Sequence, residues 1–98
     1  MVGVFEVSAL QARERAEIDR RLARWDVSAP RGPWTRRLLE SLRERPGATA
    51  QELSAQEERP VSRLKSDAWK MRELGLVEGG ADGYRLTAKG LAYLDQRG

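Results

Sequence analysis

The sequence predicts a mainly helical fold that ends in a small β-hairpin, and three observations support this. Apolar residues recur at spacings of three and four in several segments, which is typical of helices with one buried face. Proline and glycine separate these segments, for example at Pro46-Gly47 and at Gly75. Three glycines cluster between two short apolar stretches near the C-terminus, which favours a tight antiparallel turn.

Composition limits the chemistry that this chain can perform. Its 98 residues suit one domain, and they include neither Cys nor His. The chain therefore has no disulfide, no thiolate nucleophile and no imidazole base. No acidic pair has the spacing of a calcium-binding loop. We expect no enzymatic activity, no cofactor and no metal ion.

Charge and hydropathy suggest where the chain works. The formal net charge is only +3, from 18 Lys and Arg against 15 Asp and Glu spread evenly along the chain. Such a weak excess predicts that any binding to nucleic acid uses a local patch. No apolar run is long enough to span a membrane, and the start of the sequence lacks a basic leader. We therefore expect a cytoplasmic protein with no membrane association.

Residues 1–33 are expected to precede the main domain. Residues 2–7 suit a short strand or an extended segment, and residues 9–26, after a possible N-cap at Ser8, have the composition of a helix. The apolar stripe of this helix consists of Leu10, Ile18, Leu22 and Trp25. This stripe suits either the domain's own core or a second copy of the chain, and we favour a homodimer interface. Residues 28–33 contain two prolines and are predicted to form a hinge.

Residues 34–98 are expected to form the main domain, which begins with three helices. The first spans residues 34–45, buries Trp34, Leu38, Leu39 and Leu42, and ends at Pro46-Gly47. Thr49 and Glu52 have the spacing of a capping box, which opens a second helix that reaches about residue 57. The third spans residues 60–74, with Val61, Leu64, Ala68 and Met71 on its inner face and Gly75 as its left-handed stop.

A hairpin and a last helix complete the predicted domain. Residues 76–78 and 84–86 are expected to be strands, joined by the glycine-rich residues 79–83. Thr87 is placed to cap the last helix, in which Leu91 and Leu94 should face the core. Gly90 in this helix indicates close packing. Three helices, a hairpin and a helix are the order of a winged helix-turn-helix.

Two resemblances agree with this fold. The segments from Met71 to Val77 and from Tyr84 to Gly90 resemble the recognition-helix exit and the wing of winged-helix regulators, over roughly two-thirds of the chain. The resemblance implies a DNA-binding domain, although many winged helices bind proteins instead.

A narrower resemblance is carried by Gly32-Pro-Trp-Thr35, Arg45-Pro-Gly47, Glu52-Leu53 and Arg63-Leu-Lys65. These residues are similar to the C-terminal winged-helix region of actinobacterial proteins that carry an ASCH domain, a PUA-like domain associated with RNA. The match extends at most to the tail of that domain, and Trp69 and Met71 depart from the pattern, which has a basic residue and a leucine there. The functions of the ASCH domain are therefore not carried over.

The outward face of residues 60–74 is the candidate DNA-reading surface, since the last helix of a helix-turn-helix enters the major groove. The residues expected on or beside this face are Arg59, Ser62, Arg63, Lys65, Ser66, Trp69 and Lys70. Arg63 is suited to guanine O6 and N7, whereas Arg59 and Lys65 are candidates for phosphate contacts. The alternative is a solvated face on which Asp67 and Glu73 balance the cations.

Three further positions leave alternatives open. Trp69 is expected opposite the buried stripe, where it would bind nucleic acid, anchor a protein, or pack against Ile18 or Leu22. Arg85 should point outward from the wing toward DNA, although Glu78 and Asp82 oppose phosphate there. The neighbouring acids Glu57 and Glu58 are interpreted as solvated surface.

The leading hypothesis is a small protein that binds double-stranded DNA, as a transcriptional regulator that reads DNA with residues 60–74. The alternative is a module that docks on a protein partner through the winged-helix surface and the N-terminal helix. A third hypothesis, association with RNA, ranks last because the sequence predicts no RNA-reading aromatic sheet.

Overall fold

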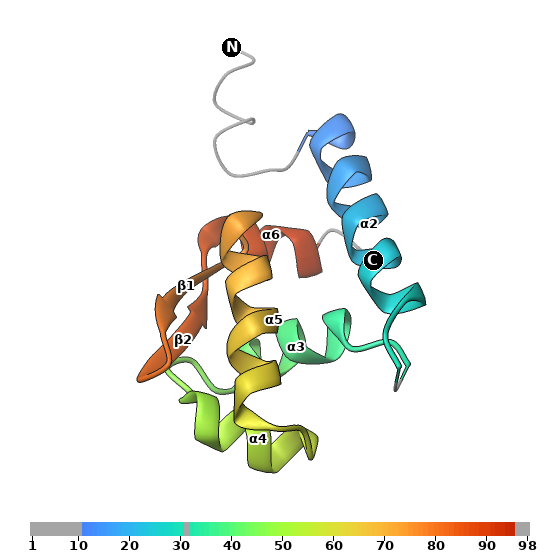
Figure 1. The fold of residues 1–98 in the computed structure, drawn as a ribbon. Helices are drawn as coiled ribbons and strands as arrows, with labels where there is room; N and C mark the ends of the chain where they lie inside the picture. The colour runs from blue at the N-terminus through green and yellow to red at the C-terminus, as the bar shows by residue number, and fades with distance from the viewer. Residues whose placement is uncertain (1–10, 31, 96–98) are drawn as a thin grey trace.

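The computed structural model describes residues 11–30 and 32–95, which form a mainly helical domain with a two-stranded antiparallel wing, as predicted (Figure 1). The elements are α2 (Ala12–Val27), α3 (Thr35–Glu44), α4 (Ala50–Glu57), α5 (Val61–Glu73), β1 (Val77–Gly80), β2 (Gly83–Leu86) and α6 (Ala88–Asp95). The strand expected in residues 2–7, the N-cap at Ser8 and the apolar Leu10 lie outside the described residues. Wherever the sequence predicted the end of a helix, the observed end lies within two residues of it, except at the start of α2.

The core is built from the apolar faces of the helices that the sequence predicted. Leu38, Leu39 and Leu42 of α3 are almost completely buried, as are Leu53 of α4 and Leu64 of α5. In α3, Leu42 follows Leu38 by four residues and Leu39 by three, so the three side chains lie on one side of the helix. The inner surface of the wing closes this core through Val77, Tyr84 and Leu86.

The corner between α4 and α5 fixes the orientation of α5. The predicted capping box is present: the Thr49 amide donates to Glu52 Oε1 over 2.9 Å, and the Glu52 amide donates to Thr49 Oγ1 over 3.0 Å. At the other end of α4, Glu58 has a left-handed backbone with φ of 57°, so the chain reverses into Pro60. The start of α4 is therefore specified by a short-range sequence signal, whereas the turn into α5 depends on the left-handed backbone of Glu58.

The wing is tighter than expected. Gly79 pairs with Tyr84 and Gly80 pairs with Gly83, so these glycines belong to the strands, and only Ala81 and Asp82 connect them. The prediction of a five-residue connection was wrong, because strands without a Cβ can pair closely; a Cβ on Gly79 would collide with the carbonyl oxygen of Gly83. A bridge between Ala48 and Tyr84 joins the wing to the segment before α4.

The last helix packs against the exit of α5. The Thr87 hydroxyl accepts from the Gly90 amide and donates to the Gly75 carbonyl oxygen, which confirms the predicted cap. A Cβ on Gly90 would collide with the carbonyl oxygen of Leu76, so glycine is required for this approach. The prediction that Leu91 faces the core was wrong, since 41% of it is exposed. The same prediction for Leu94 is confirmed, and Tyr93 is also buried.

Helix α2 packs on the body of the same chain. Ile18 and Leu22 are 3% and 5% exposed. Of the two alternatives for this apolar stripe, these two residues therefore follow the one in which it packs into the core of the same chain. Because they are buried in a single chain, Ile18 and Leu22 are not available to a second copy, and the predicted dimer interface was wrong for them. Trp25 is half-buried and stacks on Trp34, with ring centroids 6.1 Å apart. No helix in residues 11–30 and 32–95 is long and apolar enough to cross a membrane.

Candidate nucleic-acid interface

Helix α5 has one buried face and one exposed face, and the exposed face is close to that predicted. Leu64, Asp67, Ala68 and Met71 are buried, and Val61 is half-buried. The exposed residues are Ser62, Arg63, Lys65, Ser66, Trp69, Arg72 and Glu73, and Lys70 is half-buried on the flank. The predicted reading residues of this helix are therefore brought together on one surface.

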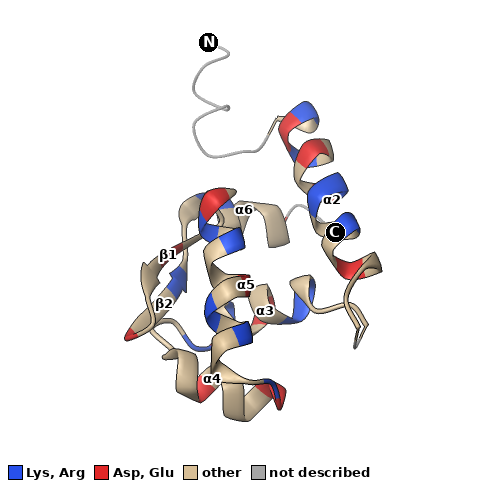
Figure 2. Cartoon of the chain, in the orientation of Figure 1, with Lys and Arg blue, Asp and Glu red and all other residues tan. Residues whose placement is uncertain are grey.

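This surface carries a local excess of positive charge. Arg63, Lys65, Lys70 and Arg72 lie on α5, and Figure 2 shows cations along the length of this helix. None of the four makes an ion pair with a described residue. Glu73 is the one exposed carboxylate within α5. The nearly neutral chain thus has a cationic patch where a groove-binding helix needs one.

One residue near this surface differs from the prediction. Asp67 was expected to balance the cations in solvent, but its side chain is 2% exposed. It pairs with Arg59, whose side chain is 13% exposed and whose guanidinium lies 5.3 Å from the centroid of the Trp34 ring. Arg59 is thus engaged with a buried carboxylate within the chain, and its assignment as a phosphate contact stays a prediction.

Trp69 is the largest apolar side chain on this surface. It is 58% exposed, whereas Ile18 and Leu22 are buried elsewhere in the core. The interpretation that Trp69 packs against Ile18 or Leu22 was therefore wrong. An exposed indole amid cations offers a flat apolar surface for a ligand.

The wing presents Arg85 outward, as its alternation with Tyr84 and Leu86 predicted. The Arg85 side chain is 66% exposed, and its Nε donates to Glu78 Oε2 across the two strands over 2.9 Å. Because this ion pair is exposed, it costs little to exchange for a contact with another anion.

Arg72 is a surface residue that the sequence analysis missed. It follows Trp69 by three residues, and residues at this spacing are neighbours on the surface of a helix. The spacing could therefore have indicated that Arg72 is exposed beside Trp69. Burial raises the pKa of Tyr84 in the wing, and the positive charge of Arg72 partly opposes this rise. Arg72 is therefore the cation of α5 that acts electrostatically on the wing.

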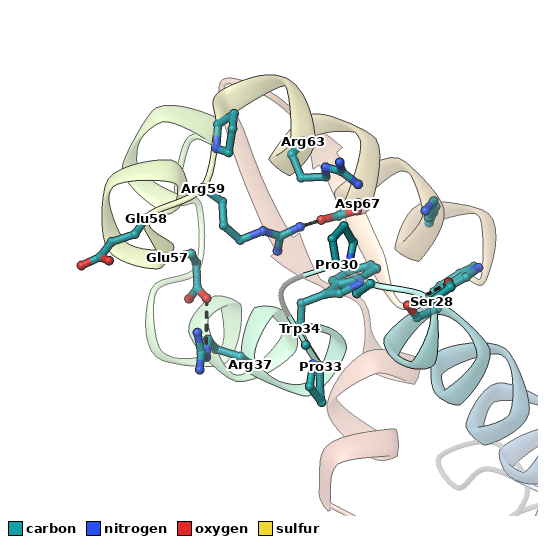
Figure 3. A pocket seen from close by; sticks show the side chains of 15 residues that line it. Ser28, Pro30, Pro33, Trp34, Arg37, Glu57, Glu58, Arg59, Arg63 and Asp67 are labelled. Carbon is teal, nitrogen blue, oxygen red and sulfur yellow. Dashed lines mark hydrogen bonds and ion pairs between the residues drawn. The ribbon is translucent and has the colours of Figure 1, made fainter.

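A cavity of about 410 Å³, hereafter the hinge pocket, adjoins the other flank of α5 (Figure 3). Its walls are residues 28–30 and 32–34 with Trp25, the turn between α4 and α5, and Arg63, Asp67 and Lys70 of α5. Lys70 Nζ lies 5.6 Å from the centroid of the Trp25 ring and 5.9 Å from that of Trp34.

Glu57 also lines this pocket, and its interpretation as solvated surface was wrong. Its side chain is 4% exposed, accepts a hydrogen bond of 2.8 Å from Ser41 Oγ, and lies 3.8 Å from Arg37 Nε. Ser41 stands on the side of α3 that meets α4, which a sequence pattern built on apolar residues does not indicate.

The fold and this surface define a helical domain with a β-hairpin wing and a cationic exposed helix. Comparison with protein-family models, with curated proteins and with solved structures finds no match to this chain. The residues that could hold a metal ion form no cluster within residues 11–30 and 32–95.

Proposed function

We propose that this chain is a DNA-binding protein that places the exposed face of α5 in the major groove of double-stranded DNA. The observation that carries the proposal is the set of four cations on α5, none of them in an ion pair with a described residue, around Ser62, Ser66 and the exposed Trp69. An α-helix fits the major groove, and its outward side chains then reach the base edges.

The positions of the cations suggest a division of roles. Arg63 lies near the start of α5 and is exposed, so it is our candidate for bidentate contact with guanine. Lys65, Lys70 and Arg72 lie on the flanks of this face and suit the phosphates that border the groove. Arg85 of the wing extends the same positive surface once it exchanges Glu78 for phosphate.

Regulation of transcription is the role that such a binder would most simply serve, in the cytoplasm where genomic DNA is accessible to it. A homodimer would match two half-sites, but it would need a surface other than Ile18 and Leu22. Both statements are parts of the proposal.

The test is a fluorescence-anisotropy titration of the purified chain with mixed genomic duplex fragments at several salt concentrations. We expect the logarithm of the binding constant to fall linearly with the logarithm of salt, with a slope of about −3 to −4 for four phosphate contacts. Lys65→Gln should reduce the slope by about 1, whereas Arg63→Gln should weaken binding by about tenfold or more at its preferred sequence.

Arg13→Gln is the matched control, because it removes one positive charge from an exposed position in the first turn of α2. Figure 1 shows this end of α2 pointing away from α5. Equal losses in Arg13→Gln and Arg63→Gln would mean that only net charge matters. No binding at low salt would overturn the proposal.

A second candidate function rests on Trp69 alone. An exposed indole at the centre of a helix face is the kind of residue that anchors a protein partner. This docking module would bind its partner with little dependence on salt, and Trp69→Ala would abolish binding while Lys65→Gln left it unchanged. Association with RNA is a third hypothesis. The same titration with duplex and single-stranded RNA tests it.

A further inference from the structure

The hinge pocket combines flat apolar walls with charge, and its shape is set by tertiary contacts. Trp25 and Trp34 lie nearly parallel, with 13° between their planes, and Pro30 and Pro33 lie beside Trp34 (Figure 3). Indole and pyrrolidine rings offer flat surfaces against which a planar group packs. A volume of about 410 Å³ is within the range of pockets that hold small ligands.

The carboxylates around this pocket are already engaged or point elsewhere. Asp67 is buried against Arg59, and Glu57 is buried against Ser41 and Arg37. Glu58 also lines the rim, but Figure 3 shows its side chain directed away from the cavity. The acidic groups therefore leave little negative charge to repel an anion.

The cations of the α5 wall are in the opposite situation. Arg63 and Lys70 both line the pocket, and neither makes an ion pair with a described residue. They are seven residues apart on α5, so they stand on one side of the helix, about 10 Å apart along its axis. A molecule between the hinge and α5 would meet positive charge at both ends of this wall.

We propose that the hinge pocket binds a small molecule that joins a flat ring to one anionic group, with the ring against the indole and proline walls and the anion held by Lys70 or Arg63. Aromatic carboxylates and nucleoside monophosphates both have this chemistry. The ring supplies apolar burial, and the anion forms charge-assisted hydrogen bonds with α5.

The pocket also connects to the DNA-reading surface, and this consequence rests on the proposed function. Arg63 and Lys70 belong to both sites, so an anion in the pocket neutralises charge that phosphate or a base would otherwise use. Ligand and DNA then weaken each other's binding by the same factor. The chain would release DNA when the ligand accumulates.

Binding is measured without DNA, by the indole N–H signals of Trp25, Trp34 and Trp69 in two-dimensional nitrogen–proton spectra. Trp69→Phe identifies the signal of Trp69, which does not line the pocket. The probes are 2-naphthoate and adenosine 5′-monophosphate, with 2-naphthalenemethanol as the ring alone and inorganic phosphate as the anion alone.

We expect 2-naphthoate, adenosine 5′-monophosphate or both to shift the signals of Trp25 and Trp34 saturably, and to leave that of Trp69 in place. Which of the two binds tells the aromatic acid from the nucleotide. Lys70→Gln and Arg63→Gln, tested separately, should identify the cation that holds the anion by weakening binding about tenfold, whereas Arg13→Gln should not change it.

Three results would overturn the proposal: no saturable shift with either ring-bearing anion, equal affinity for phosphate alone, or affinity that neither α5 substitution lowers. Adding the bound probe to the anisotropy titration then tests the competition. If the probe binds but the chain binds no DNA, the pocket stands and the proposed function fails. If DNA binds but the probe does not, only the pocket is rejected.

Discussion

The body of the domain, from α3 to α6, and the α2 arm are held together in different ways. The body has a continuous apolar core in which Leu38, Leu39 and Leu64 are almost completely inaccessible to solvent. The arm buries only Ile18 and Leu22 fully. Its remaining attachments are directed polar or aromatic contacts, so its place depends on a few particular atoms.

The most specific attachment is Asp26, near the end of α2. Its Oδ1 accepts from the backbone amides of Trp34 and Thr35 over 2.8 and 3.0 Å, and its Oδ2 accepts from Thr35 Oγ1 over 2.7 Å. Asp26 thereby caps the start of α3 from another helix, and its negative charge suits the positive end of the helix dipole. Tyr93 of α6 donates to Asp19, and Lys89 pairs with Glu14 over 2.7 Å.

This difference shows that burial can hold the body together while geometry positions the arm. Apolar burial is large but not directional, whereas a cap or a hydrogen bond requires a particular placement. The hinge pocket lies at this boundary, because Trp25 comes from the arm and Lys70 from the body.

The largest expected effect is on the body. Leu39→Ala should lower the free energy of unfolding by about 3 kcal/mol, because it leaves a cavity in a fully buried part of α3. Urea denaturation followed by circular dichroism measures this. A loss below about 1 kcal/mol would mean that the core around α3 is loosely packed. It would contradict the statement that apolar burial holds the body together more strongly than it holds the arm.

Asp26→Ala should cost less, about 1 to 2 kcal/mol, because it removes one distant cap from α3. We also expect the Trp25 indole signal to change while the signal of Trp69 on α5 stays in place. Asp26→Asn, which keeps an amide oxygen, should retain part of the stability. A loss as large as that of Leu39→Ala would show that arm and body are one core.

Tyr93→Phe should have a smaller effect, about 1 kcal/mol, since it removes only the hydroxyl that donates to Asp19. The ring stays available for its contact with Arg15, whose guanidinium carbon lies 5.6 Å from the ring centroid. Thermal unfolding of this variant and of Asp19→Asn, compared with the double variant, measures the coupling between the two residues. Strictly additive losses would contradict a direct contact.

The smallest effect is confined to alkaline solution. Burial raises the pKa of Tyr84 above its ordinary value of 10.0, so this group has no effect on stability near neutral pH. Above pH 10 the unfolded chain ionises Tyr84 while the folded chain does not, so stability falls as the pH rises toward the folded pKa.

Tyr84→Phe is the control for this pH dependence, because it removes the titrating hydroxyl and keeps the ring. The free energy of unfolding of the wild type should therefore fall more than that of Tyr84→Phe when the pH is raised from 9 to a value above 10. Urea denaturation at each pH measures this difference. The same slope in both proteins would show that other groups cause the alkaline loss.

The sequence predicted much of the fold because its signals are local. The capping box of Thr49 and Glu52, the stop at Gly75 and the buried stripe of α5 each depend on residues a few positions apart. The same stripe fixes which side of α5 is exposed, so most of the cationic surface followed from periodicity. Arg72 was missed only because the exposed face was drawn too narrowly.

The failures at charged residues concern side chains whose environment comes from a neighbouring helix or turn. Asp67 and Glu57 carry charge and stand at helical positions, so the sequence indicated solvent. Each is buried because its cation, Arg59 for Asp67 and Arg37 for Glu57, lies on the neighbouring helix or turn. The engagement of Arg59 within the chain was missed for the same reason, since its partner was not visible in the sequence.

The sequence by itself determined the order of the helices, most of their ends, the position of the wing and the outward face of α5. Short-range backbone preferences and apolar periodicity suffice for these features. Only the tertiary structure decided that the Ile18 and Leu22 stripe belongs to the chain's own core, that Asp26 caps α3, and that a pocket opens beside Lys70. These features require groups far apart in the sequence to meet at hydrogen-bonding or van der Waals distance, which no local pattern specifies.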